Sequence, residues 1–472
     1  MNGPIRVVSV AVLVMFLALL ANLTYSVTMR QTALNENSQN RRITDARFAQ
    51  DRGPIMVGNT PIAESGPVKD RFKYQREYPS GPLYAPITGF YSYLYASSAL
   101  ESSQSRFLSG ATDQQVLEQL IESAAGKSPK GATVETTISA KAQKAAWKAL
   151  AGRKGAVVAL DYHTGAVKAL VTSPSYDPAM LATHDLDASK QAWERLSADP
   201  DKPMANRATR EIYAPGSTFK LITAAAALEN GYTSDSTIDA SAYKLPGSTK
   251  QIKGSCGGAK ISLGQALRVS CNPGFARLGA ELGADTMLKQ AEAFGFGQRY
   301  LPEIGSVPSR FPEDIDPAQT AMSSIGEYEV AATPLQMAMV AAAIANDGVV
   351  MQPYIVDRVL SADLTLIQQT APAQASIAVS TGTAAQLRQM MVSVVESGTG
   401  SRAKIPGVEV GGKTGTAVTD RERLPYAWFV AYVKEYGVAV AVFIEDADIS
   451  ASEVAGGRVS APVAKAVLEA LK

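Results

Sequence analysis

Three short patterns in the sequence combine residue types that can carry out nucleophilic chemistry. The first, Ser217-Thr-Phe-Lys220, follows a Pro-Gly turn and opens a helical run at 221–229. A lysine three residues after a serine lies on the same helix face, one turn along. Desolvated and near other cations, such a lysine loses its proton and can act as base for the hydroxyl. The same spacing starts at Ser241 and Ser401, but only the pair at Ser217 lies at a clear strand-turn-helix junction.

The second pattern is Ser270-Cys271-Asn272, which follows a predicted short helix at 263–269. A serine hydroxyl can pass on a proton, and an asparagine amide can hold a peptide group. The same Ser-x-Asn pattern occurs at 38–40 in a polar stretch. By itself the pattern therefore also fits an ordinary polar loop at a helix end.

The third pattern is Lys413-Thr414-Gly415-Thr416, preceded by two glycines and a predicted strand of alternating valines. Glycines remove side chains from a strand, so that a ligand backbone can lie alongside it. Lys413 and Thr414 would then present a cation and a hydroxyl to a carboxylate. The alternative is an edge strand protected by a lysine.

Composition limits what kind of protein can carry these patterns. The chain has 472 residues, 46% of them apolar and 19% charged, which is enough for two or three folded domains. The net charge of +1 makes nucleic acid an unexpected partner. With two cysteines and two histidines, His163 and His184, the sequence predicts no metal site and no cofactor. The base for a nucleophile must then be another residue, unless it is one of these histidines.

Residues 7–29 carry no charge and lie between Arg6 and Arg30, long enough to cross ~30 Å of hydrocarbon as a helix. A cleaved signal peptide is the alternative, with Ala18 and Ala21 as a weak cleavage pattern. The apolar stretch continues past them, which favours an uncleaved single-pass anchor. By the positive-inside rule, the arginines after the helix would place the large domain in the cytoplasm. Long domains, however, cross membranes largely regardless of the number of positive charges beside the helix.

The remaining chain divides into a polar region rich in proline and a more regular region. We expect one amphipathic helix at 113–123 in the first, and a helix at 136–150 in the second. Strand pairs are predicted at 155–171 and 427–444, and a closing helix at 461–471. Strands at both ends with helices between them predict an α+β fold, an antiparallel sheet covered by helices. The predicted divisions are a short cytoplasmic tail and anchor (1–29), a membrane-proximal pedestal (30–130) and a main domain (131–472).

The order Ser-x-x-Lys, Ser-x-Asn, Lys-Thr-Gly resembles that of class B penicillin-binding proteins. The spacings, 53 residues from Ser217 to Ser270 and 143 from Ser270 to Lys413, also suit that family. The resemblance covers nearly the whole chain, including the pedestal, which is similar to the family's dimerisation module. One departure is Glu327, where the family more often has glutamine. The resemblance implies a D,D-transpeptidase that cross-links peptidoglycan stem peptides and is acylated by β-lactams.

The resemblance also implies a role for each motif residue. Three side chains would carry the catalytic steps: Ser217 as nucleophile, Lys220 as its general base and Ser270 as proton relay to the leaving amine. The backbone N–H groups of Ser217 and Thr416 would form the oxyanion hole. The residues that bind the donor peptide and its carboxylate would be Asn272, Lys413, Thr414, Gly415 and Thr416.

The implied substrate places the large domain on the outer side of the cell membrane. Expected partners are stem peptides, β-lactams, a membrane glycosyltransferase, and proteins of cell division or elongation. Alternatives stay open: a D,D-carboxypeptidase or β-lactam hydrolase using the same serine, or a sensor or scaffold without catalysis. No motif supplies the deacylating glutamate of a hydrolase, for which Glu327 is a poor candidate. A sensor would need cytoplasmic machinery, yet only about six residues precede the helix.

Cys256 and Cys271 enclose a short glycine-rich loop. In a domain outside the cell, where thiols oxidise, they are predicted to form a disulfide. The alternative is two separate small buried side chains. A disulfide would hold the loop that carries Ser270 and Asn272.

Overall fold

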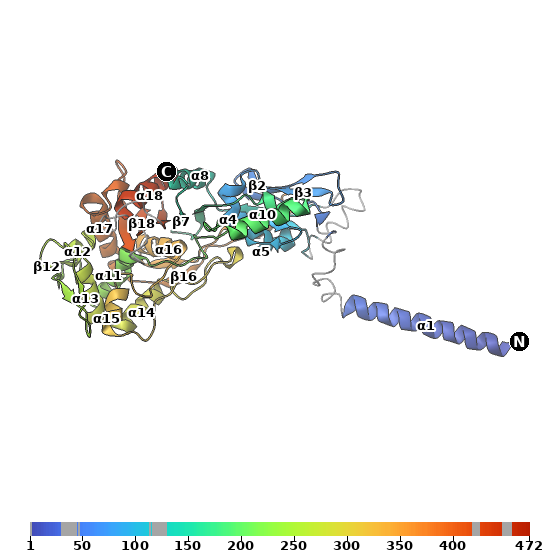
Figure 1. Cartoon of the computed structure of the whole chain (residues 1–472), viewed down its shortest axis with the longest axis horizontal. Coiled ribbons are helices and arrows are strands. Elements are labelled where there is room, and N and C mark those ends of the chain that lie inside the picture. Colours follow the sequence, from blue (N-terminus) through green and yellow to red (C-terminus); the bar gives the residue numbers. More distant parts are fainter. Residues whose placement is uncertain are drawn as a thin grey trace.

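The computed structural model describes residues 2–29, 45, 48–112, 115, 130–417, 425–445 and 456–472. Helix α1 (Asn2–Thr28) lies apart from the folded body in Figure 1. Among the described residues, α1 is the one helix long and apolar enough to cross a membrane, with a mean hydropathy of 2.5 in its most apolar window. These are the properties that the anchor prediction requires. The helix predicted at 113–123, apart from Gln115, and the Ser-x-Asn pattern at 38–40 lie outside the described residues.

The centre of the main domain is a five-stranded antiparallel sheet with strand order β17-β18-β19-β7-β8. Its register pairs Val442 of β19 with Val157 of β7, so the two ends of the domain meet in the middle of the sheet. The α+β prediction is therefore confirmed. The strands are β7 (Gly155–Asp161), β8 (Val167–Ser173), β17 (Val410–Ala417), β18 (Tyr426–Val433) and β19 (Val438–Ile444).

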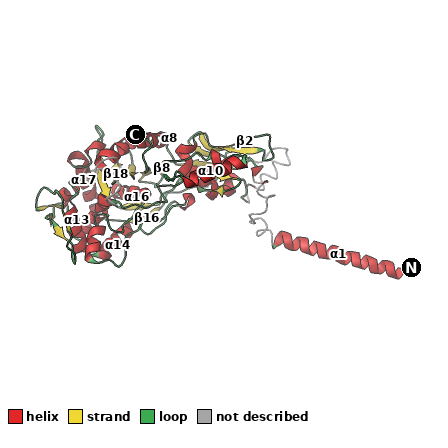
Figure 2. Cartoon of the chain, in the orientation of Figure 1, coloured by secondary structure: helices red, strands yellow, loops and turns green. Residues whose placement is uncertain are grey.

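Helices cover both faces of this sheet (Figure 2). Helices α8 (Ala140–Leu150) and α18 (Ala461–Ala470) pack on one face with Phe429 and Val440. Helices α11 (Lys220–Glu229) and α16 (Pro334–Ala345) share the other core with Trp428. Because alternate side chains enter two different cores, β18 and β19 consist almost entirely of apolar residues.

Further helices pack beside the sheet and carry the loops of the site. Several boundaries differ by a few residues from the sequence prediction, two of them in helices near the site. The helix predicted at 136–150 begins only at Ala140, because Ser139 caps it by accepting a hydrogen bond from Ala142 N; the threonine-rich segment before it forms a strand. The helix predicted at 263–269 ends at Arg268.

The helices that pack beside the sheet and carry the loops of the site are α12 (Leu263–Arg268), α13 (Asn272–Leu282), α14 (Ala284–Ala293), α15 (Pro317–Ser323) and α17 (Thr381–Ser397).

The pedestal is built on a second sheet, of six strands in the order β15-β14-β6-β1-β2-β3. β1 and β6 are parallel and the other neighbours are antiparallel. Three of its strands follow residue 130 in the sequence, so later parts of the chain complete the pedestal sheet. The strands are β1 (Ile55–Val57), β2 (Thr60–Pro67), β3 (Tyr74–Glu77), β6 (Thr133–Thr136), β14 (Val356–Leu360) and β15 (Leu366–Gln369).

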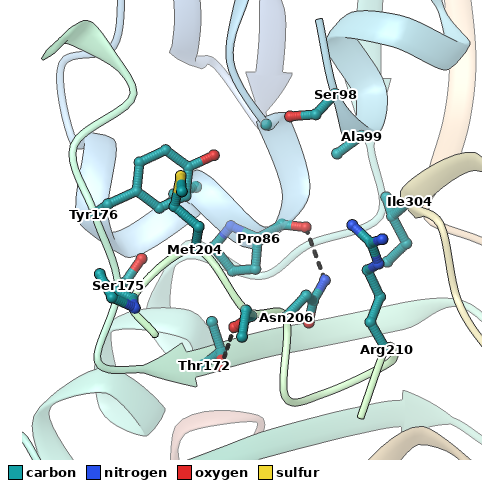
Figure 3. Close-up of a pocket in the computed structure, with 14 residues that line it drawn as sticks. Pro86, Ser98, Ala99, Thr172, Ser175, Tyr176, Met204, Asn206, Arg210 and Ile304 are labelled. Carbon is teal, nitrogen blue, oxygen red and sulfur yellow. Dashed lines mark hydrogen bonds between the residues drawn. The ribbon is translucent and has the colours of Figure 1, made fainter. Parts of the chain in front are cut away.

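Side chains at the junction fasten the pedestal to the main domain. Asn206 donates from Nδ2 to the carbonyl oxygen of Pro86 in α4 (Gly81–Thr88), at 3.1 Å (Figure 3). Gln143 of α8 donates to the carbonyl oxygen of Leu83 at 3.0 Å. Both donors are buried, so neither bond competes freely with water.

A buried ionic cluster holds the pedestal together. Glu101 of α5 (Ala99–Ser103) accepts from Nε of Arg52 and Nε of Arg76, both at 2.6 Å, and its side chain is 0% exposed. Tyr78 donates its hydroxyl to the same carboxylate at 3.2 Å. Burial disfavours the carboxylate, but the charges of Arg76 and Arg52 outweigh it and hold the pKa of Glu101 below its usual value.

We expect Glu101→Gln to lower the free energy of unfolding of the pedestal by ~3–5 kcal/mol, because it leaves two buried guanidinium groups without a counter-charge. Denaturant unfolding measures the effect. The control is Glu135→Gln, which removes an exposed pair with Arg358 of 2.5 Å and should cost less than ~1 kcal/mol. Equal effects of the two substitutions would contradict the role given to the cluster.

Candidate active site

Ser217 lies in a single 3-10 turn, η1 (Gly216–Phe219), which runs directly into α11. Gly216 has φ +52°, and a Cβ there would lie 2.7 Å from the carbonyl oxygen of Thr416. Only glycine allows this turn to approach β17 so closely. Trp428 of β18 fixes the preceding segment by donating from Nε1 to the carbonyl oxygen of Ala214 at 3.0 Å. The central sheet therefore positions the serine.

Lys220 is fully buried, and its Nζ lies among three oxygen-bearing residues. The distances are 2.9 Å to Ser217 Oγ, 2.8 Å to the carbonyl oxygen of Ser270 and 2.5 Å to Asn272 Oδ1. Two of these oxygens are carbonyls, which can only accept. A neutral amine would donate its two hydrogens to them and keep its lone pair for the Ser217 hydroxyl. The geometry therefore suits a general base.

The electrostatic surroundings favour that neutral form. Burial, followed by the charge of Lys413, holds the pKa of Lys220 well below its usual value, while Glu327 acts in the opposite direction. Burial also lowers the pKa of Lys413 to about 7. Lys413 Nζ donates to Ser270 Oγ at 2.9 Å and to the carbonyl oxygen of Thr414 at 2.8 Å.

Ser270 connects the two lysines. Its Oγ lies 3.2 Å from Nζ of Lys220 and 2.9 Å from Nζ of Lys413. Ser270 lies in the short link between α12 and α13, and its backbone is in the left-handed region, with φ +60°. Its neighbour Cys271 is bonded to Cys256, with a Cα–Cα distance of 5.1 Å, so the structure contains the expected disulfide. The disulfide therefore restrains the link that carries Ser270 and leads into α13, which begins at Asn272.

Strand β17 forms the third side of the site. It is an edge strand, so one of its edges is not paired within the sheet. Gly415 packs against the nucleophile turn, because a Cβ there would lie 2.8 Å from the carbonyl oxygen of Pro215. Thr414 is buried and its hydroxyl lies 2.7 Å from that of Thr399, whereas Thr416 is partly exposed. Of the two threonines, Thr416 therefore has the more accessible side chain.

The other Ser-x-x-Lys pairs do not form comparable sites. Ser241 and Lys244 are exposed, and the hydroxyl of Ser241 donates to Asp239 at 2.6 Å. Ser401 and its partner Lys404 are also exposed, and Lys404 pairs with Glu396. Only Lys220 contacts its serine among these three pairs.

Neither histidine takes part in the site. His184 Nδ1 contacts Asp70 Oδ2 of the pedestal at 2.6 Å, and His163 is exposed in the turn between β7 and β8, beside Tyr162. The described residues also contain no group of three or more acidic, histidine or cysteine side chains that could hold a metal ion.

The turn that follows α15 forms a wall of the site, near which the resemblance to the family had already placed Glu327; sequence reasoning missed the contact by which Gly326 holds this turn against the nucleophile turn. The carbonyl oxygen of Gly326 accepts the N–H of Gly216 at 3.0 Å. A Cβ at Gly326, where φ is +77°, would lie 2.0 Å from the carbonyl oxygen of Gly216. The signal in the sequence was an isolated glycine before Glu327, a residue that stood out only as a departure from the family.

Comparison with known proteins identifies the family. The penicillin binding protein transpeptidase domain matches residues 155–469, and the penicillin binding protein A dimerisation domain matches residues 52–134. The chain is 40% identical, over its whole length and 99% of the relative, to peptidoglycan D,D-transpeptidase PbpA of Mycolicibacterium smegmatis. It is also 39% identical, again over its whole length and 99% of the relative, to PbpA of Mycobacterium tuberculosis.

A solved structure supports the same assignment. The imipenem acyl-enzyme complex of penicillin-binding protein A from M. tuberculosis has a TM-score of 0.86 and 40% identity, covering 90% of this chain and 99% of that one. The resemblance inferred from the three motifs is thereby confirmed. The chain belongs to the penicillin-binding proteins that carry a transpeptidase domain.

Proposed function

We propose that this protein is a peptidoglycan D,D-transpeptidase with Ser217 as its nucleophile and that β-lactams acylate the same serine. The observation that carries the proposal is the contact between Ser217 Oγ and the buried amine of Lys220, 2.9 Å apart. A base with a lowered pKa next to a hydroxyl is what an activated serine requires.

In the first step the Ser217 hydroxyl gives its proton to Lys220 Nζ while Oγ bonds to the carbonyl carbon of the donor peptide. The carbonyl electron pair moves to oxygen, which the N–H groups of Ser217 and Thr416 stabilise at ~3–4 kcal/mol per donor. As the tetrahedral intermediate collapses, the C–N bond breaks. The proton returns from Lys220 through Ser270 to the leaving amine of D-alanine.

The remaining motif residues hold the donor. Lys413 is the cation for its terminal carboxylate, and the pKa of about 7 means that the lysine is cationic below that pH. A bound carboxylate stabilises the ammonium form and so favours proton uptake by Lys413. Thr414, Gly415 and Thr416 line the path of the donor along β17, and Asn272 holds its peptide group.

Similar proteins support this proposal. The relatives in M. smegmatis and M. tuberculosis are named peptidoglycan D,D-transpeptidases. Penicillin-binding protein A of M. tuberculosis forms acyl-enzyme complexes with imipenem and penicillin G. The same chemistry is proposed for this chain.

The proposed topology has α1 in the cell membrane, with the pedestal (30–130) and the catalytic domain (131–472) on the outer side. Peptidoglycan lies on that side, and a disulfide persists where thiols oxidise. The proposed partners are stem peptides and β-lactams. A separate membrane glycosyltransferase would supply glycan strands, together with proteins of cell division or elongation.

The first test is mass spectrometry of the protein after reaction with penicillin, which should show one penicilloyl adduct, on Ser217. Ser217→Ala should abolish it. Lys220→Ala should slow acylation by ~10²–10⁴-fold, as expected for a lost general base. The matched control is Lys404→Ala, in one of the exposed Ser-x-x-Lys pairs, which should leave the rate unchanged. Labelling at Ser241 or Ser401 would overturn the assignment.

The second test concerns the disulfide. Cys256→Ser should slow acylation by roughly tenfold, because small displacements of Ser270 from Lys220 weaken proton transfer. Stopped-flow acylation by penicillin measures the rate. Ser255→Ala, a change at an exposed neighbour, serves as control. An unchanged rate in Cys256→Ser would mean that the bond does not position the loop.

The third test separates cross-linking from hydrolysis, which share the acyl-enzyme and differ in what attacks it. Without a base that activates water, the penicilloyl-enzyme should be long-lived, and its decay over time can be followed by mass spectrometry. A thioester analogue of the stem peptide should be consumed faster when an amine acceptor is added. Rapid turnover of penicillin that depends on Glu327 would instead identify a hydrolase.

A further inference from the structure

The loop that follows α17 brings a hydroxyl up to the third motif. Thr399 lies two residues after the end of α17, and its Oγ1 is 2.7 Å from Oγ1 of the buried Thr414. Within the part of the chain that the structure describes, no second partner reaches the Thr414 hydroxyl. The amine of Lys413 donates to Ser270 Oγ and to the carbonyl oxygen of Thr414 instead. The orientation of this hydroxyl therefore depends on Thr399.

The backbone that carries Thr399 is held from two sides. The N–H of Gly400 donates to the carbonyl oxygen of Val394 in α17 at 3.0 Å. On the other side lies the helical turn η4 (Gly456–Ser460), where a Cβ at Gly457 would be 2.3 Å from the carbonyl oxygen of Thr399. A side chain whose backbone is fixed in this way can hold a neighbouring group in one geometry.

The direction of the bond between the two threonines decides what Thr414 offers to a ligand. A hydroxyl has one hydrogen to donate, whereas an ionised carboxylate can only accept. If Thr414 donated to Thr399, its oxygen would turn lone pairs toward a bound carboxylate. If Thr399 donates instead, the hydrogen of Thr414 is left for the carboxylate, and the hydroxyl becomes a better donor because it already accepts a bond.

We infer that Thr399 is a positioning residue for donor binding: its hydroxyl donates to Thr414 and so leaves the hydrogen of Thr414 for the terminal carboxylate of the donor peptide. This inference rests on the proposed function and extends it to one residue outside the three motifs. Thr399 needs no contact with the donor for this role, since it acts through Thr414.

The test uses two thioester analogues of the donor, whose leaving groups end in a carboxylate or in a carboxamide. Release of the free thiol gives kcat and KM for full-length protein in detergent. In Thr399→Val, KM for the carboxylate analogue should rise by ~3–10-fold, about the worth of one hydrogen bond, with kcat unchanged. KM for the carboxamide analogue should not change, because an amide both donates and accepts and can pair with the hydroxyl in either direction. A merely structural defect would affect both analogues alike.

Three further variants complete the experiment. Thr399→Ser keeps the hydroxyl and should keep the KM of the unchanged protein. Thr399→Ala removes the hydroxyl with a smaller side chain and should repeat the raised KM, which guards against a poor fit of valine. The control is Ser401→Ala, which removes an exposed hydroxyl two residues along the same loop and should alter neither constant.

The outcomes separate the inference from the proposed function. A KM that rises equally for the two analogues in Thr399→Val, or for neither, overturns the inference alone, provided that the unchanged protein is acylated on Ser217. A lower kcat with an unchanged KM would move the effect of Thr399 from binding to acylation and also overturn it. If the unchanged protein consumes neither analogue and forms no adduct on Ser217, the proposed function itself fails.

Discussion

The site depends on one physical constraint: two lysine side chains are removed from water beside the same hydroxyl. Burying a charge is expensive, and burying two like charges together is more so. Lys220 and Lys413 therefore cannot both remain ordinary cations, and both have lowered pKa values. The pKa of Lys220 is held well below its usual value, so this lysine is neutral and can act as the base. Lys413, with a pKa of about 7, can still become a cation that binds a carboxylate. The same buried environment thus gives the two lysines different roles, one as a base and the other as a cation for a carboxylate.

The fold meets this constraint by closing three elements around the lysines. The helix α11 brings Lys220 in from its N-terminal end, the edge strand β17 brings Lys413, and the link before α13 places Ser270 between them. The close approach depends on positions without a side chain, above all Gly216 and Gly415, where a Cβ would meet backbone oxygens below 3 Å. The glycine next to the Lys-Thr pair is thus explained by packing inside the protein as well as by room for a ligand.

The sequence predicted the features that are local. The apolar runs of β18 and β19, the helix after Ser217 and the three motifs each lie within a few residues, where periodicity and turn chemistry act. The pedestal sheet was not predictable in this way, because β14 joins β6 across more than 200 residues and leaves no local pattern. The same holds for Gly326, whose contact with Gly216 is visible only in the folded chain. The effect of Glu327 on Lys220 is also tertiary, since a spacing in sequence does not reveal a charge at a distance.

The same long-range pairing makes the pedestal and the catalytic domain mechanically continuous. The segment that forms β14 first bridges Tyr354 to Ala166, beside the turn that leads into β8 of the central sheet. The backbone N–H of Thr137 then donates to the carbonyl oxygen of Ile355 at 3.0 Å, and the segment continues into the pedestal sheet. Backbone hydrogen bonds to both sheets within one short segment resist sliding, because any displacement breaks several of them at once. The pedestal therefore acts as a rigid extension of the catalytic domain, because these bonds fix how the central sheet, and with it the catalytic site, is oriented relative to the pedestal sheet.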